Sequence, residues 1–91
     1  MTEGLQFDWD EANTSHVSRH GVKPAEAEQS MANDPLPVET NWRKGELRKV
    51  CVGRTDSGKR LGVVYTVRND RIRIITAYPI TRKQRGTHES R

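Results

Sequence analysis

The segment from residue 46 to residue 78 reads ELRKVCVGRTDSGKRLGVVYTVRNDRIRIITAY and decides the fold. Apolar and polar residues alternate along three stretches, 46–55, 59–68 and 71–78. The residues between them, 56–58 and 69–70, are of types that form tight turns. A period of two is typical of strands, and such short links join antiparallel neighbours. The segment therefore predicts a three-stranded antiparallel meander.

The pleat of the last strand separates its side chains into two sets. Residues of even number from Ile72 to Tyr78 share one face, and residues of odd number from Arg71 to Ala77 share the other. The two sets differ in composition. We therefore expect one face to pack on helices and the other to meet solvent or a ligand.

The sequence before the meander contains residues that typically start and end helices. Residues 5–9 alternate as a short strand does, and Asp8 or Asp10 is placed to cap a helix over residues 11–20. Gly21 can adopt the left-handed conformation that ends such a helix.

A second helix is expected to begin at Pro24, because proline is favoured in the first turn. The run Asn33-Asp34-Pro35 should stop it. Residues 35–45 contain two prolines and little periodicity, which predicts a loop with at most a short strand over residues 38–40.

Two helices followed by an antiparallel meander define an α+β fold. The 91 residues should form one domain, in which residues 80–91 make a basic terminal helix or a flexible tail. Only 32% of the residues are hydrophobic, so the core must be thin and should depend on a few large anchors. The expected anchors are Trp9, Trp42, Tyr65 and Ile74.

Charge is divided unevenly along the chain. Up to Trp42 there are eight acidic residues against two basic ones, whereas from Arg43 onward fourteen Lys and Arg residues face four acids. A positive field of this kind suits a polyanion such as RNA, because each neutralised phosphate releases counterions. The alternative is an ordinary solvated surface.

The sequence predicts a protein of the cytoplasm that does not enter a membrane. No apolar run approaches the roughly 18 residues of a membrane-spanning helix, and the first residues do not have the pattern of a secretion signal. The single cysteine, Cys51, lies between two valines and is expected to be buried and unreactive.

Glu46 and Arg48 are the first candidates for catalysis. They lie two residues apart on a predicted strand, so their side chains leave the same face. A carboxylate can take the proton of a ribose 2′-hydroxyl, and a neighbouring guanidinium can stabilise the phosphorane that follows. The alternative is a surface ion pair that contributes about 0–1 kcal/mol.

His20 is the histidine best placed to act as a general acid. Its position at a helix C-terminus favours the charged imidazolium, although it could equally serve only to cap the helix. His16 and His20 have the spacing of a metal pair, but Arg19 between them disfavours a cation. We expect neither a metal nor another cofactor.

Further residues are candidates for RNA contacts. The stretch 53–59 lacks the residue order of a phosphate-binding loop and is better explained as a hairpin turn. Its Arg54, Lys59 and Arg60 add to the positive field. Trp42, in the expected loop, could stack on a base. Trp9 is expected in the core, because it shares a strand face with Phe7.

Several short motifs, taken together, resemble the BrnT toxin family over nearly the whole chain. They are Phe7-Asp8-Trp9-Asp10, Arg19-His20-Gly21-Val22, Asp34-Pro35, Glu46-Leu47-Arg48, Gly53-Arg54 and the run from Arg71 to Ala77. The resemblance implies a RelE-like fold, with helices packed on a small antiparallel sheet. It also implies metal-independent cleavage of messenger RNA and a BrnA-type antitoxin partner, with operator DNA contacted only through the toxin–antitoxin complex.

The resemblance assigns functional positions to Glu46 and Arg48, with His20 and Trp9 nearby. Our hypothesis is that Glu46 or a neighbouring base deprotonates the 2′-hydroxyl, that Arg48 and either Arg73 or Arg82 bind the phosphate, and that His20 protonates the leaving oxygen.

Two departures from the family pattern touch this site. Tyr78 stands where such sequences usually have arginine, and a later Arg-x-x-Glu pattern appears here as Arg82-Lys83-Gln84-Arg85, without an acid. Tyr78 and Lys83 remain candidates for RNA contacts, but weakened or absent catalysis is expected. Two alternatives therefore stay open: a basic module that binds nucleic acid without cleaving it, and a subunit that only pairs with an acidic antitoxin.

Overall fold

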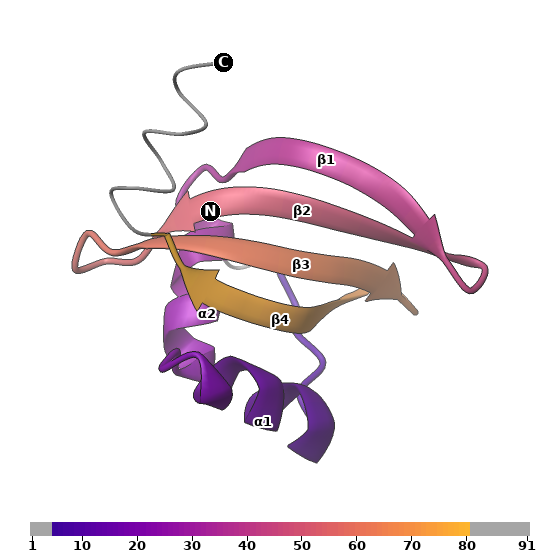
Figure 1. Cartoon of the computed structure of the whole chain (residues 1–91), viewed down its shortest axis with the longest axis horizontal. Helices are drawn as coiled ribbons and strands as arrows, with labels where there is room; N and C mark the ends of the chain where they lie inside the picture. The colour runs from indigo at the N-terminus through magenta and orange to yellow at the C-terminus, as the bar shows by residue number, and fades with distance from the viewer. Residues whose placement is uncertain (1–4, 81–91) are drawn as a thin grey trace.

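The computed structural model describes residues 5–80. Two helices, α1 (Glu11–Arg19) and α2 (Pro24–Ala32), precede four strands, β1 (Leu36–Arg43), β2 (Glu46–Arg54), β3 (Arg60–Arg68) and β4 (Arg71–Pro79). The strands form one antiparallel sheet in the order β1-β2-β3-β4, and both helices lie on one side of it (Figure 1). The predicted α+β arrangement, with the helices packed on a small antiparallel sheet, is confirmed.

The first strand of the sheet is the main correction to the sequence analysis. The prediction of a loop over residues 35–45 is wrong, because β1 pairs with β2 along its length. Lys44 and Gly45 have φ angles of 53° and 77° and close a two-residue turn of the type that joins antiparallel strands. Pro37 is tolerated because β1 is an edge strand with an irregular register after that residue.

Local capping explains where α1 begins and ends. Asp10 is the N-cap and exchanges hydrogen bonds with Asn13, while Gly21, at φ 74°, follows the last turn. The buried Asn13 amide also donates to the carbonyls of Asp8 and Ile74, both at 2.9 Å, which fixes α1 to β4. Of the strand predicted over residues 5–9, only a bridge between Phe7 and Ile72 forms.

The core lies between the helices and the sheet. Its buried members are Val17, Val22, Ala27, Met31, Cys51, Leu61, Val63, Ile74 and Ala77. Trp9 and Tyr65 pack against this cluster as expected, but the prediction of Trp42 as an anchor is wrong, since 69% of it is exposed. The helices pack mainly on β2, β3 and β4, so the edge strand that carries Trp42 receives little cover. Within residues 5–80 no helix is long and apolar enough to span a membrane.

A bulge in β4 breaks the alternation expected along that strand. Val64 pairs with Thr76 but Tyr65 pairs with Ile74, so Ile75 is an extra residue. The bulge turns Ile74 and Ala77 toward the same face, and both are buried against the helices. The prediction that they occupy opposite faces is therefore wrong.

The contact of α2 with β2 depends on a residue without a side chain. A Cβ added at Gly53 would collide with the backbone carbonyl of Ser30. Gly53→Ala should therefore lower the free energy of unfolding by about 1–3 kcal/mol, the range for overpacking. Chemical denaturation measures this, with Val38→Ala on the exposed edge strand as the control. Equal stability of the two variants would contradict the close approach.

Candidate functional site

The sheet face opposite the helices carries most of the arginines, and we call it the open face. Directly paired residues on neighbouring strands point to the same face and so form rows across the sheet. One row contains Leu36, Val52, Gly62 and Tyr78, and the next contains Glu39, Val50, Val64 and Thr76. Arginines flank these two rows along the strands: Arg54 and Arg60 lie on one side of them, and Arg48, Arg68, Arg71 and Arg73 lie on the other. The centre of the open face is thus largely apolar and its ends are cationic.

Glu46 lies between two guanidinium groups on the open face. The Arg68 Nε lies 2.6 Å from one carboxylate oxygen, and the Arg48 Nε lies 3.6 Å from the other. The pKa of Glu46 is lowered, first by the hydrogen bond from Arg68 and then by the charges of both arginines. Glu46 is therefore ionised at neutral pH, and the structure brings it together with Arg48.

Arg48 is held less firmly than Arg68. Its Nε is buried and makes no hydrogen bond within the described residues, although Glu46 is close. A buried donor without a partner is costly, so this guanidinium is available to donate a hydrogen bond to a ligand.

Arg73 is engaged by acids from the start of the chain. Its guanidinium lies 3.0 Å from one Asp10 oxygen and 3.7 Å from Asp8. The pKa of Asp10 is lowered, chiefly by the hydrogen bond that Arg73 donates. Arg73 must therefore exchange these contacts before it can bind a phosphate.

His20 is not found beside Glu46. It caps the C-terminus of α1 and lies near Tyr78, with the two ring centroids 6.2 Å apart. Tyr78 is seven residues along β4 from Arg71, which pairs with Arg68, so this end of the strand is about 20 Å from Glu46. The structure does not bring His20 together with the Glu46–Arg48 pair.

The residues predicted to contact RNA do not all lie on the open face. Trp42 pairs with Leu47 and so faces away from the open face. Lys59 forms an ion pair with Glu26 of α2, at 3.0 Å. Arg54 and Tyr78 do lie on the open face. Arg82, Lys83 and Gln84, like the predicted terminal helix or tail, lie outside the described residues.

Cys51 takes no part in this site. It is buried beside Met31, as expected, and burial raises the pKa of its thiol to about 11. Among residues 5–80, no three His, Cys, Asp or Glu side chains gather in a group that could hold a metal ion.

Two residues of the site escaped the sequence analysis, Arg68 and Asp10. The signal for Arg68 was the hairpin itself: the constant register of β2 and β3, continued toward Glu46, puts Arg68 opposite that residue. Asp10 was recognised as a helix cap, but its contact with Arg73 depends on how α1 packs on β4.

Together, the fold and the open face define a small α+β protein with two helices on one side of its sheet and a cationic surface on the other. A family model described as "Ribonuclease toxin, BrnT, of type II toxin-antitoxin system" matches residues 9–84. The chain therefore belongs to the BrnT family of ribonuclease toxins, whose members act with an antitoxin partner. Comparison with curated proteins finds no match.

The arginine clamp on Glu46 can be tested by titration. Arg68→Ala should raise the pKa of Glu46 toward its ordinary value, because the hydrogen bond from Arg68 is the largest cause of the depression. NMR titration of the side-chain carboxyl group measures this shift. Arg71→Ala on the next strand is the control and should leave the pKa depressed. An unchanged titration in the Arg68 variant would refute the clamp.

Proposed function

We propose that this chain is a toxin that cleaves messenger RNA without a metal, in the cytoplasm, at Glu46 and the arginines around it. The observation that carries the proposal is the ionised Glu46 held between Arg48 and Arg68, on a sheet face that no helix of residues 5–80 covers. A base and two phosphate-binding groups are thereby available to one ligand. Family membership supports the same activity.

In the proposed reaction the ribose 2′-hydroxyl attacks the adjacent phosphorus. Its proton passes to Glu46, a bond forms between O2′ and phosphorus, and the bond from phosphorus to O5′ breaks. Arg48 and Arg68 stabilise the charge on the phosphorane. O5′ takes a proton from solvent, because His20 lies at the other end of β4. The products are a 2′,3′-cyclic phosphate and a free 5′-hydroxyl.

The low pKa of Glu46 is compatible with its role as a base. In the free protein Arg68 is hydrogen-bonded to the carboxylate and Arg48 lies beside it, and the two positive charges make Glu46 a weak base. A bound phosphate would draw those guanidiniums toward itself, and the basicity of Glu46 would rise. Substrate binding would then activate the base at the point where it is needed.

We further propose that the antitoxin is of the BrnA type, and that the toxin reaches operator DNA only within their complex. The replacement of the usual arginine by Tyr78 supports an alternative, in which the protein binds RNA without cleaving it. A third possibility is that the basic surface serves only to pair with an acidic antitoxin.

Incubation of labelled RNA with the protein in EDTA separates these functions. The wild type should yield a cyclic-phosphate product, and Arg48→Ala should lower the rate by about 10²–10³-fold, as loss of a transition-state donor does. Arg48→Ala should also abolish growth inhibition. Lys49→Ala, which changes the next residue on the opposite face, is the matched control. Circular dichroism checks that both variants fold.

Intact RNA with the wild type, together with retained binding, would overturn the enzymatic proposal in favour of the binding module. Unchanged cleavage by the Arg48 variant would instead remove Arg48 from the mechanism.

A further inference from the structure

A second cationic site lies at the end of the open face remote from Glu46. An open cavity of about 640 Å³ is found there, and Arg54, Arg60, Val52 and Leu36 are among its lining residues. Arg54 is six residues along β2 from Arg48, which corresponds to about 20 Å. The cavity is therefore separate from the proposed catalytic group but shares its surface.

Two like charges face each other in this cavity. Arg54 and Arg60 are directly paired across β2 and β3, an arrangement that is unfavourable unless an anion joins them. No carboxylate within residues 5–80 comes within 4 Å of either guanidinium, whereas Arg48, Arg68 and Arg73 all have acidic neighbours. Within the described part of the chain, the two guanidiniums therefore have no anion bound to them.

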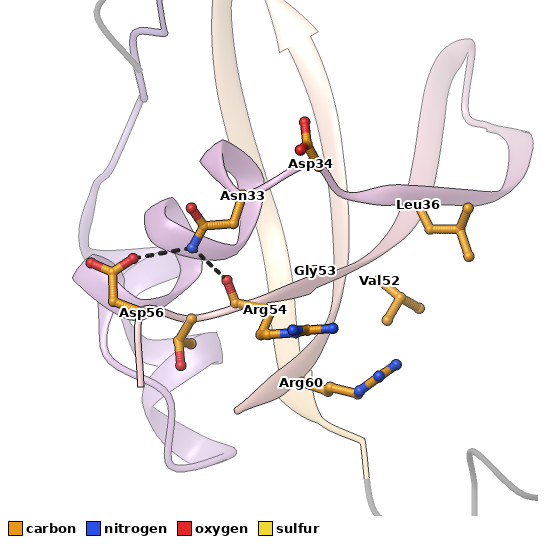
Figure 2. A pocket seen from close by; sticks show the side chains of 9 residues that line it. Asn33, Asp34, Leu36, Val52, Gly53, Arg54, Asp56 and Arg60 are labelled. Carbon is orange, nitrogen blue, oxygen red and sulfur yellow. Dashed lines mark hydrogen bonds between the residues drawn. The ribbon is translucent and has the colours of Figure 1, made fainter. Parts of the chain in front are cut away.

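The acids that line the same cavity do not neutralise the pair. Asp56 accepts a hydrogen bond from the Asn33 side chain at 3.1 Å. Figure 2 shows the two guanidiniums extending toward Val52 and Leu36, while the carboxylates of Asp34 and Asp56 point elsewhere. The anion would therefore meet the arginines on the side where apolar groups also lie.

The row beside the arginines offers an apolar surface for a base. Leu36, Val52, Gly62 and Tyr78 follow one another across the four strands. The end of the Tyr78 ring rests on Gly62, so closely that an added Cβ would lie 2.7 Å from the ring Cζ. Tyr78 thus lies in the register row next to the Arg54–Arg60 pair. Proteins that bind single-stranded nucleic acids combine aromatic rings, on which bases stack, with cations that hold the phosphates.

We propose that Arg54 and Arg60 form a distal phosphate subsite for RNA that lies along the open face, with Tyr78 beside it as a base contact. The subsite deepens the proposed function and rests on it for the identity of the ligand. A span of about 20 Å corresponds to about six stacked nucleotides at about 3.4 Å each, and to fewer when the strand is extended. The substrate is accordingly a single strand several nucleotides long, not a dinucleotide.

The probes for the test are fluorescent 2′-O-methyl oligoribonucleotides of two and eight nucleotides. They have no free 2′-hydroxyl, so the proposed reaction cannot consume them. Anisotropy titrations at several salt concentrations give the affinity and its salt dependence. The wild type should bind the eight-nucleotide probe at least about tenfold more tightly than the dinucleotide, a gain of about 1.4 kcal/mol.

The double variant Arg54→Ala/Arg60→Ala should bring the affinity for the longer probe down to that for the dinucleotide. It should also reduce the slope of log K against log salt by about 1.4, since each phosphate contact on a single strand contributes about 0.7. The control Arg19→Ala/Lys49→Ala removes the same charge from outside the open face and should keep the length dependence. Should the double alanine variant not fold, Arg54→Gln and Arg60→Gln tested singly replace it.

A length dependence that survives the double variant, or is lost equally in the control, would overturn the subsite. So would an unchanged affinity for the longer probe together with a weakened antitoxin complex, which would assign the pair to the protein partner. Cleavage of unmodified RNA is measured separately. Binding with the expected length dependence but without cleavage would refute the proposed function and leave the subsite standing.

Discussion

Two nine-residue helices can cover only one face of the four-stranded sheet, and the remaining features follow from this limit. The covered face holds the apolar core, from Val17 of α1 to Ala77 of β4. Within residues 5–80 the other face has no second layer of helices and is exposed to solvent. Its arginines are solvated by water, and they also make it the cationic surface of the molecule.

The arginines of the open face differ in what already holds them. Arg68 is hydrogen-bonded to Glu46, and Arg73 to Asp10. Arg48 is only loosely engaged, and Arg54 faces Arg60 with no carboxylate of the described residues within 4 Å of either guanidinium. The arginines therefore differ in how readily they can bind a polyanion. Some can bind at once, and others must first release a carboxylate.

The sequence was sufficient to predict the helices, the meander and the Glu46–Arg48 pair, because these depend on local periodicity and spacing. It was insufficient to predict the strand over residues 36–43. Every residue of this edge strand is exposed, so the sequence there need not alternate between apolar and polar residues. The bulge at Ile75 and the distance between His20 and Glu46 were likewise beyond its reach. Both are set by tertiary packing, which no short stretch of sequence records.

The central claim is that RNA lies on the open face. NMR of valine and leucine methyl groups in the presence of an uncleavable 2′-O-methyl octanucleotide tests it most directly. The account predicts that the methyl signals of Val50, Val52 and Val64 shift on titration, while those of Leu61 and Val63, buried under the helices, stay in place. Shifts confined to the helical side of the protein, with the three open-face valines unchanged, would contradict it.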